Sequence, residues 1–292
     1  MVVERSPVNA SQWLSLILAT YGRSEELTTV LDSLVKQSEQ GFEIIVVDQN
    51  PDDRLVPVLK AFASLNIRHL RQPTPNLSQA RNRGLSEATG EWVAFPDDDC
   101  WYEPDCLSRV RSAMTAEPAL DGIVARWVEV APELEQAGYR LNRSDWRNFR
   151  GGDASSITLF LRRTAVAALD GFDPRIGVGQ YFGAGEETDL VLRLLDRNSE
   201  LAFLPDARVH HHFSDEAPKA SRKAWQARRS RSRGVGAIYA KHRLSPKVII
   251  RGLLAPLLNP WRGPRPLQEL FFGFAASLGR LEGLLGWWFG RS

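Results

Sequence analysis

Cysteine is scarce in this 292-residue sequence, which contains only Cys100 and Cys106. Two cysteines cannot build a disulfide framework or a four-ligand zinc site, and they fit a reduced, cytoplasmic setting. The sequence also has no uninterrupted apolar run of the ~18 residues that a membrane-spanning helix needs. Its first residues lack a basic segment followed by an apolar one, so no secretory signal is expected. We therefore expect a protein that is soluble or peripheral to a membrane.

Several nucleotide-binding and catalytic motifs are absent as well. The sequence has no G-x-x-x-x-G-K-[ST], which argues against a P-loop nucleotide hydrolase. No G-x-G-x-x-G follows the first apolar run, which argues against a Rossmann dehydrogenase. A G-x-S-x-G serine nucleophile is missing too. The chemistry of this chain must be sought in other residues.

Acidic residues are missing from residues 217–268, which hold thirteen lysines and arginines. Residues 1–216 hold 22 Lys and Arg against 33 Asp and Glu, a net charge of −11, whereas residues 217–292 hold 15 against 2, a net charge of +13. The segments 248–261 and 270–290 are apolar but interrupted by charge, proline or glycine, which is typical of amphipathic helices. We expect one domain over 1–216 and a basic, amphipathic helical extension over 217–292.

Short apolar runs alternate with helical patterns in the first hundred residues, which predicts an α/β fold with a parallel sheet covered on both faces. The carboxyl ends of such strands share one edge, where ligands bind. Thr20 and Tyr21, Asp48 to Asn50, and Asp97 to Asp99 would all lie at that edge. The expected strands are 14–20, 42–48, 67–71, 91–95, 121–130, 155–161 and 201–205. The expected helices are 25–37, 54–65, 77–88, 105–114, a helix from Arg163 and 186–196. Residues 131–153 are expected to form a loop.

Three adjacent aspartates, Asp97, Asp98 and Asp99, follow the fourth predicted strand. Adjacent carboxylates without basic neighbours suit a hard divalent cation such as Mg²⁺ or Mn²⁺. The alternative is an acidic turn at the start of the helix predicted after Pro104. Because Glu103 and Asp105 are expected to serve as the first-turn acids of that helix, we favour the metal site.

Two other clusters leave alternatives open. Glu186 and Glu187 begin a predicted helix; they either complement the helix dipole or include a general base, because neighbouring carboxylates raise each other's pKa. Three histidines, His210 to His212, are either an inert surface cluster or a source of one metal ligand. On a strand, His211 would face away from the other two, so only one face could reach a cation.

Four segments resemble, in order, the motifs of the inverting family 2 glycosyltransferases with the GT-A fold. They are residues 14–34, 42–53, 76–100 and 171–195, and the resemblance runs from about Leu14 to His212. It implies a GT-A type, mostly parallel nucleotide-binding sheet flanked by helices, which is Rossmann-like. It also implies a nucleotide-sugar donor, linked to UDP, GDP or dTDP.

The resemblance assigns roles to individual residues. It implies a Mn²⁺ or Mg²⁺ ion held by Asp97 and Asp99, with His211 as the histidine that aligns best with an additional metal contact. Glu187 falls at the position of the general base, where relatives usually carry aspartate, and Glu186 remains the rival. The implied nucleotide contacts are Thr20, Tyr21, Asp48, Arg81 and, at the ribose, Asp98.

These implications lead to one function hypothesis with two rivals. We expect a metal-dependent inverting glycosyltransferase that acts on a hydroxyl of a glycan or lipid-linked acceptor in cell-surface polysaccharide or glycolipid assembly. A sugar-nucleotide nucleotidyltransferase would need a glycine-rich basic loop after the first strand, where this chain has a single glycine and Arg23. A non-catalytic membrane-bound scaffold of the same fold is the other rival.

The basic extension, residues 217–292, permits three interpretations. It is a solvated helical face, a nucleic-acid contact, or a surface attracted to an anionic membrane. We favour the membrane, which would make the protein peripheral on its inner face, and we regard nucleic acid as unlikely because no nucleic-acid-binding fold is present. The loop 131–153 and the glycine-rich residues before Glu186 are expected to shape the acceptor pocket, without a readable specificity.

Overall fold

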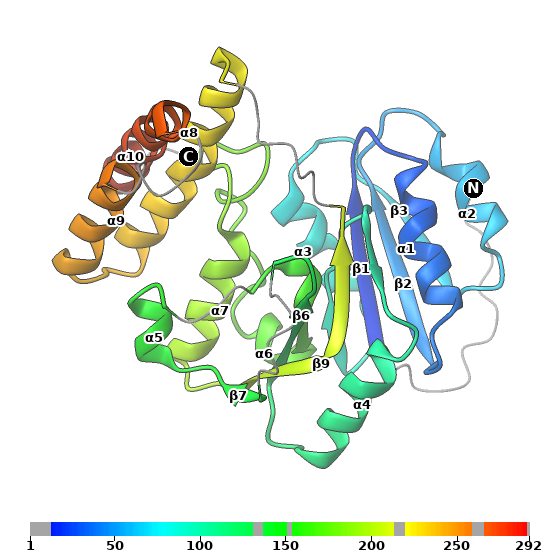
Figure 1. The fold of residues 1–292 in the computed structure, drawn as a ribbon. Coiled ribbons are helices and arrows are strands. Elements are labelled where there is room, and N and C mark those ends of the chain that lie inside the picture. The colour runs from blue at the N-terminus through cyan, green and yellow to red at the C-terminus, as the bar shows by residue number, and fades with distance from the viewer. Residues whose placement is uncertain (1–12, 131–136, 151–153, 213–219, 259–265, 291–292) are drawn as a thin grey trace.

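A computed structural model describes residues 13–130, 137–150, 154–212, 220–258 and 266–290 (Figure 1). Two predictions fall partly outside these residues, the loop at 131–153 and the segment 248–261. In the part of the chain that the structure describes, no helix has the length and apolar character needed to cross a membrane.

The strands form one nine-stranded sheet in the order β3-β2-β1-β4-β8-β6-β9-β5, with β7 paired to β9. The neighbours β3, β2, β1 and β4 are parallel, as the sequence predicts, whereas β8 is antiparallel to both β4 and β6. The strands are β1 Leu14–Thr20, β2 Phe42–Asp48, β3 Ile67–Arg71, β4 Trp92–Ala94, β5 Cys100–Tyr102, β6 Gly122–Trp127, β7 Tyr139–Arg140, β8 Leu159–Arg162 and β9 Leu201–His211.

Helices cover both faces of this sheet, as expected for continuous apolar strands. Leu16 and Leu18 of β1 point into one core with helices α1 and α4, and Ile17 points into the other with α3 and α7, because side chains alternate along a strand. The helices are α1 Glu26–Val35, α2 Leu55–Ala61, α3 Leu77–Glu87, α4 Cys106–Ala116, α5 Arg143–Arg147, α6 Arg163–Ala167, α7 Glu186–Asp196, α8 Arg222–Lys241, α9 Pro246–Leu258 and α10 Pro266–Trp288.

The chain between Asp99 and α4 differs from the prediction. Residues 100–102 form the unpredicted strand β5, which pairs with the end of β9, and α4 begins at Cys106 without an acid in its first turn. The prediction that Glu103 and Asp105 are first-turn acids was therefore wrong. The carboxylate of Glu103 instead lies 3.3 Å from His210 Nε2, and that of Asp105 lies 2.6 Å from Arg109 Nη2.

Two further segments differ from the prediction. The predicted loop 131–153 contains the strand β7 and the short helix α5, in which Asn142 accepts hydrogen bonds from the backbone of Ser144 and Asp145. Ser156–Thr158, within the strand expected at 155–161, forms a 3₁₀ helix, and β8 follows at Leu159. Helix α5 and the 3₁₀ helix have local hydrogen bonds between side chains and backbone, and β7 forms by pairing with β9. Apolar periodicity reveals neither kind of contact.

The C-terminal helices α8, α9 and α10 lie together at one end of the molecule, away from α1 and α2 (Figure 1). Helix α8 packs on the segment that leads into α7: a Cβ atom on Gly234 would lie 1.6 Å from the carbonyl oxygen of Ala184. Only glycine permits so close an approach. The extension therefore braces residues 183–185, immediately before Glu186.

A buried ionic cluster joins the extension to both ends of the glycine-rich segment. Lys241 Nζ, at the end of α8, lies 2.8 Å from a carboxylate oxygen of Asp173 and 2.7 Å from one of Asp189. Asp189 is fully buried and also contacts His242 Nε2 at 2.9 Å and Arg193 Nε at 2.8 Å. These partners hold the pKa of the Asp189 carboxyl below its ordinary value despite the opposing effect of burial.

Replacing Lys241 with methionine is expected to lower the free energy of unfolding by about 2 kcal/mol, since hydrogen bonds to charged groups contribute roughly this much. Asp189 keeps His242 and Arg193, so the variant should still fold. Thermal denaturation measures the effect, with the exposed Lys60→Met as control. Equal melting temperatures for the two variants would contradict a stabilising role of Lys241.

Candidate active site

The carboxyl ends of β1, β2 and β4 meet at one edge of the sheet, and the end of β9 reaches the same place through its pairing with β5. In that register His211 lies opposite Cys100, the residue after Asp99. This pairing, between residues more than 100 positions apart, brings a histidine beside the aspartates.

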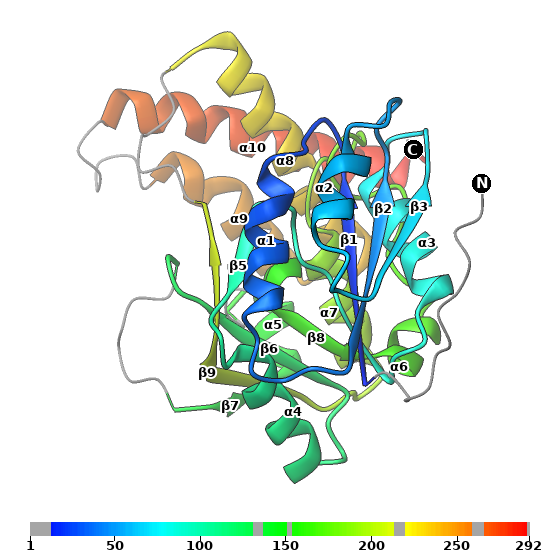
Figure 2. The same ribbon diagram turned by 90° about the vertical axis from the view of Figure 1, so that its right-hand side faces the viewer.

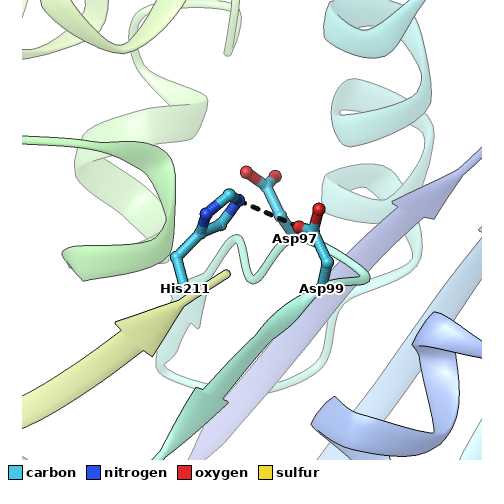
Figure 3. Close-up of side chains that lie close together, drawn as sticks. All are labelled: Asp97, Asp99 and His211. Atoms are coloured by element: carbon cyan, nitrogen blue, oxygen red, sulfur yellow. Dashed lines mark ion pairs between the residues drawn. The ribbon is translucent and has the colours of Figure 1, made fainter. Parts of the chain in front are cut away.

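Asp97, Asp99 and His211 each offer one ligand atom, and these atoms all lie within 4.8 Å of one another (Figure 3). His211 Nε2 lies 2.9 Å from a carboxylate oxygen of Asp99. His210 points elsewhere, toward Glu129 at 2.8 Å and Glu103 at 3.3 Å. The alternation expected for this strand therefore places His211, and not His210, at the aspartates.

The charges of this cluster are consistent with a cation site. His211 and Arg23 oppose the effect of burial and hold the pKa of the Asp99 carboxyl at about 2, so it is ionised at neutral pH. Burial raises the pKa of the Asp97 carboxyl, although Arg81 opposes the rise. Two carboxylates and one imidazole are oxygen and nitrogen donors of the kind that Mn²⁺ accepts, and Mg²⁺ accepts the carboxylates. The residues present thus fit the divalent cation that the resemblance implies.

The middle aspartate has different neighbours from the other two. The hydroxyl of Thr20 donates to Asp98 Oδ2 at 2.6 Å, and Arg23 Nη1 donates to Asp98 Oδ1 at 2.6 Å and to Asp99 Oδ2 at 2.5 Å. Burial raises the pKa of the Asp98 carboxyl, while Thr20 and Arg23 oppose that rise. Asp98 thus links the ends of β1 and β4, and Arg23 neutralises part of the aspartate charge.

Asp48, at the end of β2, is fully buried and surrounded by donors. His69 Nε2 lies 2.9 Å from Oδ2, Arg71 Nη1 lies 3.1 Å from the same atom, and the Asn50 side chain donates to Oδ1 at 2.8 Å. Tyr21, predicted to contact the nucleotide, is 57% exposed at the end of β1, so its ring is free to pack against a ligand.

Arg81 connects the aspartates to the glutamates of α7. Its guanidinium is buried and donates to Asp97 Oδ1 at 3.0 Å and to Glu186 Oε1 at 3.1 Å. The sequence analysis assigned Arg81 to the nucleotide; the structure places it between two carboxylates. This arrangement links the start of α7 to the aspartates at the carboxyl edge of the sheet.

The two glutamates of α7 have unlike surroundings. Glu186 is buried and paired with Arg81, whereas Glu187 forms no ion pair with the residues that the structure describes. Burial raises the pKa of the Glu187 carboxyl to about 8, and the charge of Glu186 adds to the rise. A carboxylate with a pKa near neutrality can both hold and release a proton, which is the property of a general base.

Sequence reasoning overlooked several residues of this edge. Arg23 was weighed only as part of a missing nucleotidyltransferase loop, and His69 and Arg71 were not considered as site residues. The rule that strand ends converge could have found Arg71, because it ends β3 beside Asp48. Arg23 has no such signal, since it lies three residues beyond the end of β1.

Comparison with known proteins places this geometry in a family. The model of "Glycosyl transferase family 2" matches residues 15–167. The putative glycosyltransferase EpsH of Bacillus subtilis is 34% identical over 128 residues, which are 43% of this chain and 36% of that protein. The succinoglycan biosynthesis protein ExoM of Rhizobium meliloti is 29% identical and covers 76% of this chain and 72% of its own length. The match thus spans only about a third of EpsH.

Solved structures agree with the observed fold. The mannosyltransferase PcManGT from Pyrobaculum calidifontis, in complex with GDP-Man and Mn²⁺, superposes with a TM-score of 0.64 at 15% identity, covering 97% of this chain and 89% of its own. Residues 1–349 of S. aureus TarS, in complex with UDP-GlcNAc, give a TM-score of 0.57 at 16% identity, covering 95% and 92%. These likenesses confirm the predicted GT-A type architecture, and with the family match they establish that the chain belongs to glycosyl transferase family 2.

Proposed function

We propose that this chain is a metal-dependent, inverting glycosyltransferase, which moves a sugar from a nucleoside diphosphate to a hydroxyl of a glycan or lipid-linked acceptor. The observation that supports this most directly is the placement of Asp97, Asp99 and His211 beside the two glutamates of α7, with Arg81 linking the groups. The neighbours in complex with GDP-Man and Mn²⁺ and with UDP-GlcNAc suggest the donor class. Relatives named for succinoglycan and amylovoran biosynthesis suggest polysaccharide assembly.

The donor would bind across the carboxyl edge of the sheet. Tyr21 and the cluster around Asp48 would meet the nucleoside, and Asp98 the ribose. Asp97, Asp99 and His211 would hold the cation, which when bound neutralises the charge that develops on the departing diphosphate. With Asp99 bound to the cation, Arg23 would keep its hydrogen bond to Asp98 and direct its other donors toward a phosphate oxygen.

Glu187 would accept the proton of the acceptor hydroxyl as its oxygen attacks the anomeric carbon. Because one displacement occurs, the configuration at that carbon inverts. Arg81 would hold the Glu186 carboxylate in place beside Glu187, whose raised pKa owes most to burial and part to that neighbouring carboxylate. We also propose that the reaction takes place at the inner face of a membrane, where the basic extension meets anionic lipid.

Thermal shift with Mn²⁺ and UDP, GDP or dTDP tests the proposal. One of these nucleotides at about 100 times its dissociation constant should stabilise the protein by ~2.7 kcal/mol, a rise in melting temperature of about 5 °C, and only when the metal is present. The corresponding nucleotide sugar should then release diphosphate in the presence of an acceptor. Failure of every nucleotide to stabilise the metal-loaded protein would exclude the function.

A further inference from the structure

Helix α10 carries an unbroken row of exposed apolar side chains, which we call the α10 stripe. Each of its members is at least 36% exposed, and Trp288 and Leu267 are more than 60% exposed. Spacings of three and four residues place them on one face of the helix along its whole length. The members are Leu267, Phe271, Phe274, Leu278, Leu281, Leu285 and Trp288. A contiguous apolar surface of this kind marks an interaction site.

The opposite face of α10 is already used by the chain itself. Small residues let it approach α8 closely: a Cβ atom on Gly283 would lie 1.9 Å from the carbonyl oxygen of Arg233. The acid on this helix nearest α8, Glu282, pairs with Arg229 and Arg233. Helix α10 is therefore held by its glycine face, and the α10 stripe points away from the protein.

Cations without counter-ions lie beside this helix. Arg228 and Arg231 of α8 are exposed, and neither forms an ion pair with any described residue. Although Arg228 is exposed as a whole, its guanidinium is partly covered, and this desolvation together with the charges of Arg280 and Arg231 lowers its pKa, so these guanidinium groups repel one another. No acid occurs anywhere in residues 217–268 to relieve this repulsion. An anionic partner would do so.

We propose that the α10 stripe docks into the interface of an anionic lipid bilayer, to which the net charge of +13 of the extension, Arg228 included, is attracted. Aromatic and leucine side chains on one face, with basic residues beside it, are the features of a helix that lies in the membrane surface. The inference rests on the proposed location at a membrane and names the surface that would meet the lipid; it does not depend on which sugar or acceptor is used.

A second copy of this chain is the competing occupant, since the spacing of the α10 stripe would also suit a coiled coil. Coiled coils select their partners through charged residues that flank the apolar row. The flanking positions of α10 carry one charge, Glu282, and both arginines that neutralise it belong to the same chain. The flanks are Gln268, Leu270, Ala275, Ser277, Glu282, Leu284 and Phe289. They favour the bilayer.

Flotation of the full chain with phosphatidylcholine vesicles, with and without phosphatidylglycerol, tests the inference. The native protein should float with the anionic vesicles and be released by salt. Phe274→Ser and Leu281→Ser should each weaken binding about tenfold, because each loses most of one apolar side chain from the bilayer. Val35→Ser, an equally exposed position on α1, is the matched control and should bind normally.

The charge contribution is measured separately. Arg228→Gln should reduce binding to the anionic vesicles about fivefold and leave binding to neutral vesicles unchanged. Absence of binding by the native chain, or equal binding by Phe274→Ser, would overturn the inference. So would a dimer in light scattering that Leu281→Ser dissociates and vesicles leave intact. Nucleotide-induced thermal shift, measured on the same variants, reports the proposed function independently of membrane binding.

Discussion

Glutamine in place of Glu187 should reduce the rate of sugar transfer by about 10²- to 10⁴-fold, the range that a general base contributes. The substitution keeps the shape of the side chain and removes only the oxygen that accepts the proton. Asp97, Asp99 and His211 are untouched, so stabilisation by nucleotide and Mn²⁺ should remain as in the native protein. Single-turnover transfer and thermal shift together separate these two effects.

The pH dependence of transfer supplies an independent readout for Glu187. Burial and Glu186 raise the pKa of its carboxyl to about 8, so the base is mostly protonated at pH 7 and becomes competent as the pH rises. A bound divalent cation near Asp97 would lower that pKa. The rate in the metal-loaded enzyme should therefore rise with an inflection between the ordinary value of 4.5 and 8, and this inflection should vanish in Glu187→Gln.

Glu186→Gln is the matched control, because it changes the adjacent glutamate by the same single atom. It leaves Arg81 with Asp97 as its remaining carboxylate partner. We expect a smaller loss of transfer and a lower melting temperature, since a buried guanidinium loses one of its two ion pairs. If Glu186→Gln loses transfer while Glu187→Gln retains it, the assignment of the base is reversed.

The predictable part of this fold is the part built from consecutive elements. From Leu14 to Ala94, strands and helices alternate along the chain, and the parallel pairing of β1, β2, β3 and β4 follows from that alternation. The second half of the sheet is not ordered in this way. Strand β8 is inserted antiparallel between β4 and β6, and β5 pairs with β9 across more than 100 residues. Three-residue strands such as β5 carry too little periodicity to be recognised.

The candidate site likewise has a part that the sequence predicts and a part that it does not. The convergence of Thr20, Asp48 and the aspartates follows from where parallel strands end. The link from Arg81 to Glu186 does not, because it joins α3 to α7 through side chains that no spacing relates. The sequence left open which histidine meets the aspartates, and the pairing of Cys100 with His211 decides it. Figure 2 shows β5 beside β9, and Figure 3 shows His211 beside Asp97 and Asp99.

The extension illustrates what charge counts miss. Its net charge of +13 predicts attraction to anions. It does not predict that α8 packs against residues 183–185 or that Lys241 forms ion pairs with Asp173 and Asp189. Those contacts come from Gly234, which has no side chain, and from Lys241, which is one of the fifteen cations of the extension. A count of charges distinguishes neither residue. The predicted boundary between 1–216 and 217–292 thus separates an acidic segment from a basic one. The contacts of α8 with residues 183–185, Asp173 and Asp189 join the two segments.

Alanine in place of Asp99 should abolish the metal-dependent part of nucleotide binding. Asp99 is the aspartate with the lowest pKa of the three, about 2, so it offers a charged oxygen at every working pH. Its removal leaves Asp97 and His211 as the remaining members of the cluster, and the affinity for Mn²⁺ should fall at least ~100-fold, the upper range seen when outer-shell partners of ligands are lost. Calorimetric titration with Mn²⁺ in the presence of the nucleotide measures this directly.

Asp105→Ala provides the matched control for Asp99→Ala. Asp105 belongs to the same acidic stretch, but its carboxylate lies on the surface and pairs with Arg109 rather than with the cluster. Its loss should leave Mn²⁺ affinity unchanged and cost no more than ~1 kcal/mol of stability, as for other exposed pairs. If both variants lose metal binding equally, the acidic stretch attracts the cation through its total charge. Asp97, Asp99 and His211 are then not a separate set of ligands. If only Asp99→Ala loses it, that stretch contains a defined site followed by residues that serve the surface.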